Sequence, residues 1–429
     1  MNKLFSDTNR AKLLMIFSAN VCPLPHWRPI VLVHGYLGSG DTYGKHAQRF
    51  SSNGHCLARI FAFDWNTLNQ NLDSVPLLDA FVDDVLSVTG STQIDLAGHS
   101  AGGGLGYEYL MDPDRAEKVA HYAHIGSFAY ETAAGPEGGV PTLNLTSEGD
   151  LVVVTDGSIP GATNVRLQEE DHYSVATSNA SFKAIYRHFH DGVDPEYVQI
   201  LGEEKIEAYG KVLSFGENEA IDGATVEVYE VDPETGLHRT QEPLATVQSD
   251  EKGLWGPVPI LAGTYYDFRA VDPAGGSVAP HYYLQPFLRT NPFVYLRTLP
   301  TGMSLVGLLL GSLPFDKEES VVVIFSNHQA LVSGRDSLEI DGREILTDEI
   351  APAEETTLAL FLYDENANGK SDWSPVATFA ELPFLTGIDS FFPVDTGEPI
   401  RLNLNGNSFS IPALAASTDG PVVVILDAP

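Results

Sequence analysis

The pentapeptide Gly-His-Ser-Ala-Gly at residues 98–102 constrains the fold of this chain more than any other feature. An apolar run over residues 94–97 precedes it, and a segment of helical character over residues 105–111 follows it. A strand, a sharp turn of small residues and a helix are the context of a nucleophile elbow, in which a serine is held above the edge of a parallel sheet. We therefore predict an α/β fold that exposes Ser100 at this edge. A plain glycine-rich turn is the alternative, and three further motifs count against it.

The first further motif is residues 31–38, Val-Leu-Val-His-Gly-Tyr-Leu-Gly, a β-branched strand that runs into a turn with glycines. Ester hydrolysis needs two backbone N–H groups directed at the developing oxyanion. One normally comes from the residue after the nucleophile, here Ala101, and the other from the loop after an early strand, where Tyr36 is the candidate. We expect His34 and His99 to be structural histidines.

The second and third motifs are strands that end in polar turns, one presenting Asp150 and the other presenting His172 after residues 164–167. The chain order is therefore serine, acid, histidine, which is the order of α/β-hydrolases and differs from that of the chymotrypsin and subtilisin folds. In this arrangement His172 takes the proton of Ser100, and Asp150 fixes the imidazole tautomer and stabilises the imidazolium.

Other residues of the same types stand close to these positions in the sequence. The alternatives are Glu148 and Asp156 for the acid, and His188 and His190 for the base. Residues 186–190 have the pattern of the end of a helix, away from a strand tip. Asp171 is a sequence neighbour of His172 and is badly placed to reach its Nδ1.

Residues 29–192 resemble the minimal α/β-hydrolase lipases, small bacterial triacylglycerol lipases without a large lid. The segments that carry the resemblance are residues 29–35, 61–65, 94–100, 147–153 and 161–165. The resemblance implies ester hydrolysis by a Ser/Asp/His triad without a cofactor, and oxyanion donors at Tyr36 and Ala101. The chain departs from the family at Ala101, where many relatives carry a larger residue, and in the acidic run over residues 169–171. Both departures leave the substrate preference open.

The length of 429 residues predicts two or three domains. Strands alternate with helical segments up to residue 194, and short strands broken by Gly, Pro, Asp and Asn follow. We predict four parts: a segment 1–28 that is a weak leader or a helix, an α/β-hydrolase domain 29–193, a β-sandwich 194–295, and a second β-sandwich or jelly roll 296–429.

Residues 205–277 resemble a carboxypeptidase-regulatory or transthyretin-like sandwich, without a peptidase zinc site. The architecture as a whole is similar to archaeal-type two-domain lipases with a C-terminal β-barrel. We hypothesise that the β region packs beside the Ser100 edge and supplies part of an acyl groove. The apolar stretch over residues 300–314 is one candidate lining, and sandwich core is the alternative for its leucines.

The loop over residues 364–372, Asp-Glu-Asn-Ala-Asn-Gly-Lys-Ser-Asp, matches the first part of a calcium loop, with oxygen ligands at alternate positions and a glycine at the sixth. The twelfth position is Pro375, so the bidentate glutamate of such loops is absent. The residues of a structural Ca²⁺ site would be Asp364, Asn366, Asn368, Lys370 and Asp372. An acidic Asx/Gly turn between strands is the alternative.

The chain is strongly acidic, with 24 basic and 58 acidic side chains and a net charge of −34. Residues 1–195 hold 12 basic and 22 acidic side chains, and residues 196–429 hold 12 and 36, so most of the excess lies in the β region. Such a surface disfavours nucleic acid and anionic membranes as partners. No apolar run reaches transmembrane length. The resemblance implies an apolar ester or a lipid–water interface as the partner, and the oligomeric state stays open.

The chain has two cysteines, Cys22 and Cys56. Secreted relatives of the resembled family often bridge these two places, so the resemblance implies a disulfide. Two buried thiols are the alternative. Residues 12–19 are a poor signal-peptide core. We nevertheless expect a secreted or extracytoplasmic protein.

These observations favour a carboxylic ester hydrolase, a lipase or esterase, with two appended β modules. A polyester or polyhydroxyalkanoate depolymerase, whose modules grip a solid polymer, is the enzymatic alternative. A surface-binding β protein with an inactive hydrolase domain is the alternative of another class, and the complete set of Ser100, Asp150 and His172 argues against it.

Overall fold

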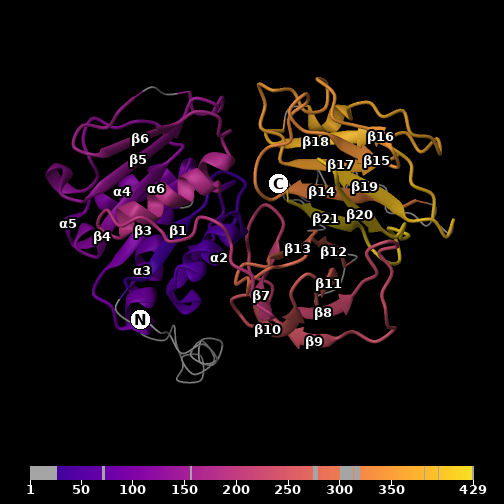
Figure 1. Ribbon diagram of the computed structural model, residues 1–429, viewed down its shortest axis with the longest axis horizontal. Coiled ribbons are helices and arrows are strands. Elements are labelled where there is room, and N and C mark those ends of the chain that lie inside the picture. The colour runs from indigo at the N-terminus through magenta and orange to yellow at the C-terminus, as the bar shows by residue number, and fades with distance from the viewer. Residues whose placement is uncertain are drawn as a thin grey trace. The chain divides into compact units, whose positions relative to one another are not determined.

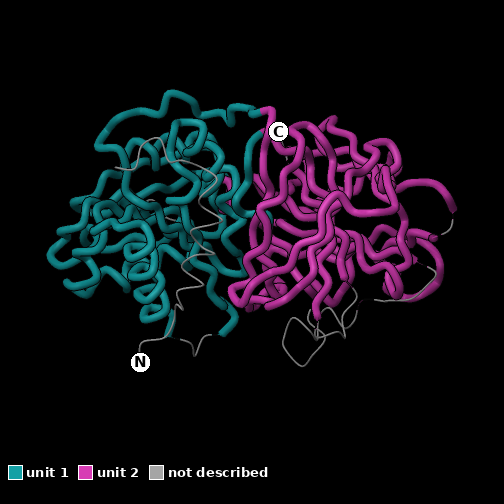
Figure 2. The backbone as a smooth tube through the Cα atoms, turned by 90° about the horizontal axis from the view of Figure 1, so that it is seen from below, with its two compact units in different colours: residues 1–170, 175–203, 289–294 teal, residues 171–174, 204–288, 295–429 magenta. Residues whose placement is uncertain are grey.

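The chain forms two compact units (Figure 2). Unit 1 takes its residues from 1–170, 175–203 and 289–294, and unit 2 from 171–174, 204–288 and 295–429. The computed structural model describes residues 27–69, 73–154, 157–273, 279–299, 313, 319–380, 382–394 and 396–427.

Unit 1 is built on a six-stranded sheet with strand order β2-β1-β3-β4-β5-β6, in which all neighbouring strands are parallel (Figure 1). The strands are β1 Ile30–Val33, β2 Ile60–Phe63, β3 Ile94–His99, β4 Val119–Ile125, β5 Thr142–Ser147 and β6 Thr163–Leu167. Every residue of β1 and β3 is buried, because helices cover both faces of a parallel sheet.

The helices of unit 1 are α2 Gly44–Ser52, α3 Ser74–Thr89, α4 Ala101–Leu110, α5 Pro113–Ala116 and α6 Asn179–Phe189, with 3-10 turns η1 Gly40–Tyr43, η2 Leu57–Arg59, η3 Pro136–Gly138 and η4 Ser174–Ala176. Valines and leucines of α3 and α4 form one core cluster with Val31 and Val33. Helices α2 and α6 contact each other through the rings of Phe50 and Phe182. The predicted α/β class of this region is confirmed.

The turn between β3 and α4 is closely packed, as the predicted strand–turn–helix pattern requires. A Cβ atom at Gly98 would overlap the carbonyl oxygen of Gly102, and one at Gly102 would lie 2.5 Å from the carbonyl oxygens of Val33 and His34. Only glycine allows this approach, because no side-chain atom fits between the helix and the strand ends. The packing of α4 against β1 therefore depends on these two glycines.

Unit 2 is almost wholly β-structure and contains a three-stranded sheet β10-β7-β13, an eight-stranded sheet β18-β17-β14-β21-β12-β11-β8-β9 and a four-stranded sheet β16-β15-β19-β20. The strands are β7 Lys205–Ser214, β8 Thr225–Glu230, β9 Ala245–Gln248, β10 Leu254–Leu261, β11 Tyr266–Val271, β12 His281–Leu284, β13 Leu296–Thr298, β14 Val322–Ser326, β15 Leu338–Ile340, β16 Arg343–Glu344, β17 Ala359–Tyr363, β18 Leu385–Asp389, β19 Ile400–Leu404, β20 Asn407–Ile411 and β21 Val422–Leu426, with a 3-10 turn η5 Ala377–Phe379. The predicted β-rich C-terminal region is confirmed.

The eight-stranded sheet takes strands from both predicted β segments. Strands β8, β9, β11 and β12 come from 194–295, and β14, β17, β18 and β21 come from 296–429. The parallel pair β12–β21, in register from His281 opposite Val422, joins the two halves. One apolar cluster fills the space between this sheet and the four-stranded sheet. The predicted division of this region into a β-sandwich 194–295 and a second β-sandwich or jelly roll 296–429 stays a prediction.

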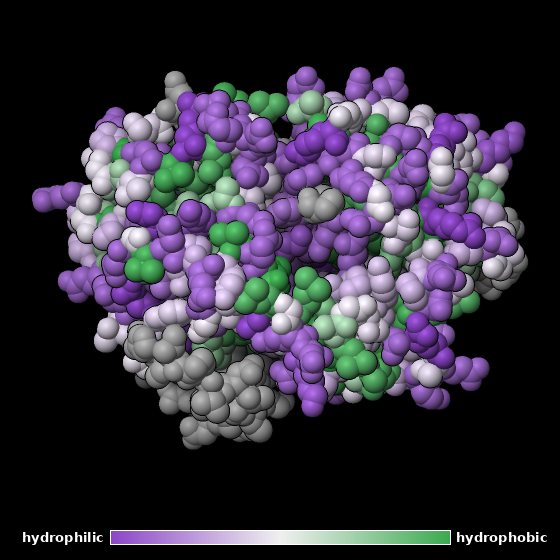
Figure 3. Space-filling view, viewed as in Figure 1, coloured by the Kyte–Doolittle hydropathy of each residue, from purple (hydrophilic) through white to green (hydrophobic). Residues whose placement is uncertain are grey.

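Several sequence expectations fall on residues outside the described part of the chain. These are the leader or helix within residues 1–28, of which only 27 and 28 are described, Cys22 with its predicted disulfide to Cys56, and the apolar stretch 300–314, of which only Leu313 is described. Both Cys56 and Leu313 are buried. No helix in the described ranges is long and apolar enough to cross a membrane. Figure 3 shows mainly hydrophilic side chains on the face that it draws, with smaller apolar groups between them.

We expect Gly102→Ala and Gly104→Ala to have opposite effects on stability, although both residues lie in α4. Gly102→Ala pushes a methyl group against two carbonyl oxygens, and we expect it to lower the free energy of unfolding by at least about 2 kcal/mol. The nearest atom to a Cβ at Gly104 is the Tyr130 hydroxyl at 4.0 Å, so Gly104→Ala should gain up to about 1 kcal/mol from helix propensity. Denaturant unfolding of both variants measures the difference, and equal midpoints would contradict the packing argument.

Candidate active site

Each of the predicted catalytic residues follows the carboxyl end of a strand of the parallel sheet along the chain. Ser100 directly follows β3, and its N–H donates to the carbonyl oxygen of Ile125 at the end of β4, 2.9 Å away. Asp150 follows β5, and His172 lies in the loop after β6. This is the edge at which open α/β sheets place their ligands.

Ser100 has a strained backbone, with φ 52° and ψ −120°, at the N-terminus of α4. Residues other than glycine rarely adopt such a conformation, and it is typical of functional sites. The loop after β1 lies against this turn, because a Cβ at Gly35 would be 3.1 Å from both the Cβ of Ser100 and the Nδ1 of His99. The local packing therefore holds the serine at the tip of the turn.

The predicted oxyanion donors flank Ser100 in unit 1. Ala101 is the first residue of α4, where backbone N–H groups have no partner within the helix. Tyr36 follows Gly35 and has an exposed side chain. Within the described ranges, neither of these two N–H groups makes a hydrogen bond to the protein. Two donors of this kind can serve an oxyanion that develops beside the Ser100 hydroxyl.

Asp150 is buried and is held by its own turn. Its Oδ1 accepts from the N–H groups of Val152 at 3.0 Å and Val153 at 2.9 Å. The alternative acid Glu148 is exposed and lies 3.5 Å from the guanidinium of Arg166. The other alternative acid, Asp156, lies outside the described residues. Burial and a fixed carboxylate therefore favour Asp150 over Glu148.

The residues on both sides of the turn that carries His172 pack against loops of unit 1: Glu169 lies against the loop of Asp150, and Val175 lies against the end of β4. A Cβ at Gly149, the neighbour of Asp150, would lie 2.9 Å from the backbone of Glu169. A Cβ at Gly126, which directly follows β4, would lie 2.8 Å from Cγ1 of Val175. The chain therefore leaves the loop of Asp150 at Glu169, forms the turn that carries His172, and packs against the end of β4 at Val175.

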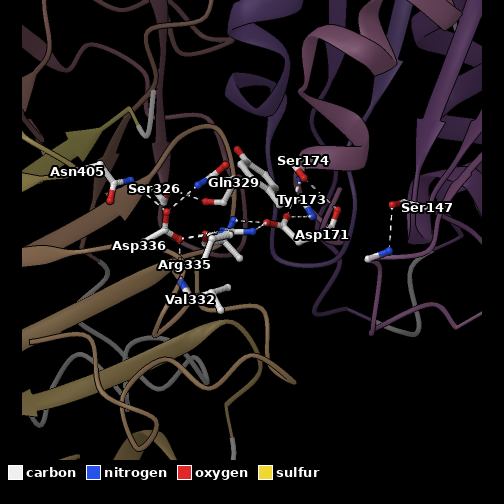
Figure 4. A network of polar contacts seen from close by, with 12 residues as sticks. Ser147, Asp171, Tyr173, Ser174, Ser326, Gln329, Val332, Arg335, Asp336 and Asn405 are labelled. Atoms are coloured by element: carbon white, nitrogen blue, oxygen red, sulfur yellow. Dashed lines mark hydrogen bonds and ion pairs between the residues drawn. The ribbon is translucent and has the colours of Figure 1, made fainter. Parts of the chain in front are cut away.

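Asp171 shapes the turn that carries His172 (Figure 4). Its Oδ1 accepts from the N–H groups of Tyr173 at 3.0 Å and Ser174 at 2.8 Å. His172 itself is buried, and its ring is stacked on the ring of Phe384, with 6.3 Å between centroids. The expectation that Asp171 is not the triad acid agrees with this use of its carboxylate.

The second oxygen of Asp171 contacts other residues of unit 2, the unit to which residues 171–174 belong. Oδ2 accepts from the N–H of Ala330 and from Nη1 of Arg335, both at 3.0 Å. The Arg335 guanidinium also pairs with Asp336 at 3.0 Å. Burial opposes the charge of Arg335, but Asp171 and Asp336 outweigh it and hold the pKa of the guanidinium above its ordinary value. Sequence reasoning missed Arg335, because it is 164 positions from Asp171 and no local pattern marks it.

Asp336 is fixed in turn by neighbouring polar groups of unit 2 (Figure 4). Its carboxylate accepts from the N–H of Val332 at 3.0 Å and from the side-chain amides of Gln329 at 2.9 Å and Asn405 at 3.1 Å. Arg335 therefore approaches Asp171 from a position that several hydrogen bonds determine.

The other histidines of unit 1 considered for catalysis lie elsewhere or have backbone partners. His188 Nε2 is 3.2 Å from the carbonyl oxygen of Pro141, which precedes β5, so it lies at the amino edge of the sheet. Burial and the neighbouring His121 lower the pKa of His188 to about 4. His190 packs edge-on against Trp27, before β1. The ring of His34 contacts the backbone through both nitrogens, at Gly35 O and Trp65 N, as expected of a structural histidine.

The loop of the predicted calcium site folds as a turn around Asp364. This residue is buried, and its two oxygens accept from the N–H groups of Asn368 at 3.1 Å and Gly369 at 2.6 Å. The other predicted ligands, namely Asn366, Asn368, Lys370 and Asp372, have exposed side chains. The turn geometry neither requires nor tests an ion, and Ca²⁺ binding stays a prediction.

We expect Arg335→Gln to reduce the esterase activity predicted from the sequence, because Asp171 loses a charged partner and the His172 turn loses an anchor. The expected loss in kcat/KM on p-nitrophenyl butyrate is about tenfold or more. Arg239→Gln is the matched control, since Arg239 pairs with Glu230 at the surface of the same unit. If kcat/KM of Arg335→Gln equals that of the control, the contact does not position His172.

Family models match most of this architecture. The model described as Lipase (class 2) matches residues 27–111, which include the β1 loop and the Ser100 turn. The model described as Lipase C-terminal domain matches residues 204–300, and a further C-terminal-domain model matches residues 321–424.

Solved structures are similar to the chain at low identity. The mature form of lipase BlEst2 from Bacillus licheniformis is 16% identical, over 38% of this chain and 93% of that protein, with a TM-score of 0.32. The naproxen esterase from Bacillus subtilis is 16% identical, over 38% and 84%, with a TM-score of 0.30. Aspergillus fumigatus lipase B is 15% identical, over 40% and 54%, with a TM-score of 0.31. At these values the likenesses carry no argument about function. Over the residues that the family models match, and in its fold, the chain is similar to lipase- and esterase-type α/β-hydrolases that carry a C-terminal β extension.

Proposed function

We propose that this protein hydrolyses carboxylic esters, namely acylglycerols or similar apolar esters, through an acyl-enzyme intermediate on Ser100. The observation that carries the proposal is the strained turn of Ser100 between β3 and α4, at the edge where Asp150 and His172 also follow their strands. Backbone strain at a serine that directly follows a strand and begins a helix is what a nucleophile elbow requires.

In the proposed mechanism, Ser100 Oγ attacks the ester carbonyl carbon while His172 takes the hydroxyl proton. The carbonyl oxygen becomes an oxyanion, and the N–H groups of Tyr36 and Ala101 stabilise it. His172 then gives its proton to the leaving alcohol, and the C–O bond breaks to leave an acyl-serine. Water, deprotonated by His172, attacks the acyl carbon in the second half, and Ser100 recovers its proton as the carboxylic acid leaves.

Asp150 has the role of orienting the imidazole. Its Oδ1 is fixed by the amides of Val152 and Val153, so the carboxylate plane is set by the turn that follows β5. We assign Oδ2 to the Nδ1–H of His172, which would select the tautomer with its lone pair on Nε2 and stabilise the imidazolium.

The substrate class rests on the family and on apolar groups at the same edge of the sheet. Large apolar side chains are exposed in the loops after β1, β4 and β5: Tyr36, Phe128, Tyr130, Leu151, Val152 and Val154. Apolar side chains that are exposed on several loops at one edge of a sheet can contribute to a surface that binds apolar ligands or interfaces. They support an apolar acyl group or a lipid–water interface as the partner of this edge.

Ser100→Ala should abolish turnover without unfolding the protein, because only the attacking oxygen is removed. The expected loss in kcat is on the order of 10⁵–10⁶ on p-nitrophenyl butyrate, with an unchanged denaturation midpoint. Turnover that persists in a folded Ser100→Ala protein would disprove the nucleophile. In the wild type, hydrolysis of emulsified triglyceride is expected, and activity confined to polyester film would instead support a depolymerase.

Asp150→Asn should lower kcat by about 10⁴, because an amide cannot hold the correct tautomer or stabilise the imidazolium. Glu148→Gln is the matched control, since Glu148 is exposed and lies in the same loop. We expect the control to keep near-normal kcat. If Asp150→Asn retains more than about a tenth of the activity while Glu148→Gln loses it, the acid is Glu148.

A further inference from the structure

Three side chains from separate segments of unit 2 meet at one carboxylate oxygen. Asp267 lies on β11, His281 on β12, and His238 in the connection between β8 and β9. Oδ2 of Asp267 is 2.7 Å from Nε2 of His238 and 2.6 Å from Nδ1 of His281. In the part of the chain that the structure describes, no other group of three or more His, Cys, Asp or Glu side chains is close enough to share a metal ion.

Asp267 occupies a position where an apolar side chain is expected. It lies on β11, an inner strand of the eight-stranded sheet, opposite Tyr229 on β8 and Tyr283 on β12, and is fully buried. Burial would raise the pKa of Asp267, but the two imidazoles outweigh it and hold the pKa below its ordinary value. A charged carboxylate at such a place needs strong compensation.

Hydrogen bonds account for only one of the two carboxylate oxygens. His238 and His281 both face Oδ2, whereas the buried Oδ1 has no hydrogen-bond partner among the described residues. An unpaired buried oxygen on a charged group costs on the order of 1–3 kcal/mol or more. A cation beside the carboxylate would compensate both the charge and this oxygen.

We propose that His238, Asp267 and His281 bind one divalent transition-metal ion, with zinc as the best match. Two imidazole nitrogens and one carboxylate oxygen are ligands that Zn²⁺ prefers, whereas Ca²⁺ and Mg²⁺ take sites made of oxygen. Three protein ligands leave a fourth position to water. The ion would tie the β8–β9 connection to strands β11 and β12.

The site has an entry side and a ligand that can adjust. His238 is 28% exposed, whereas His281 is 9% exposed, so an ion would enter past His238. The ring of His238 is stacked on Tyr229, with 3.9 Å between centroids, which sets its orientation. A tetrahedral ion with bonds of about 2.1 Å holds its ligands about 3.4 Å apart, so binding requires His238 to move outward slightly.

Zinc titration of the full chain tests the proposal and does not depend on ester hydrolysis. Calorimetry, and mass-spectrometric metal analysis after dialysis against Zn²⁺, should both give one ion per chain. His238→Gln should weaken zinc binding by at least about 100-fold, because a direct ligand is lost. His188→Gln, at a similarly exposed histidine outside the cluster, is the control and should bind like the wild type. Equal binding by wild type and His238→Gln, or no binding by the wild type, would overturn the proposal.

A second measurement does not require a variant. Co²⁺ added to the wild type should give visible absorption bands of a four-coordinate ion, which Zn²⁺ then displaces. Zn²⁺ should also raise the thermal midpoint of the wild type, since an ion that binds only the folded state stabilises it. Absence of both the cobalt bands and the zinc-induced shift would also overturn the proposal.

Discussion

The close approach of α4 to the ends of β1 and β3 is the constraint on which the proposed catalytic centre depends. Gly98 and Gly102 leave no room for a side-chain atom, and this contact forces Ser100 into a backbone conformation with φ 52°. The strain is held by packing in the core of unit 1 rather than by the serine itself. The same contact brings the β1 loop, with Gly35 and the N–H of Tyr36, against the serine.

The turn that carries His172 depends on a second constraint, because the two carboxylate oxygens of Asp171 bind different partners. One oxygen shapes the turn through the amides of Tyr173 and Ser174, and the other is held by Ala330 and Arg335. Because residues 171–174 group with unit 2, the β extension is part of the support of the candidate base. Removing everything after residue 194 would therefore remove the partners of this second oxygen.

Local patterns in the sequence were sufficient to predict the α/β class, the strand–turn–helix around Ser100 and a β-rich C-terminal region. They succeed because strand alternation, glycine turns and helix periodicity are properties of neighbouring residues. The Asp171–Arg335 contact and the cluster of His238, Asp267 and His281 join distant segments, so no local pattern predicts them. One signal was present: the charged residue Asp267 stands between Tyr266 and Phe268 in the strand Tyr266–Val271. The pairing of β12 with β21 was likewise outside the reach of strand patterns.

The central claim is that Ser100 is the nucleophile of this protein, and locating a covalent adduct tests it most directly. The wild-type protein is treated with a fluorophosphonate ester until hydrolysis of p-nitrophenyl butyrate stops, and its peptides are then mapped by tandem mass spectrometry. The account predicts one adduct per chain, on the Oγ of Ser100 within residues 98–102. An adduct on another residue that accompanies the loss of activity, or full inactivation with Ser100 unmodified, would contradict the account.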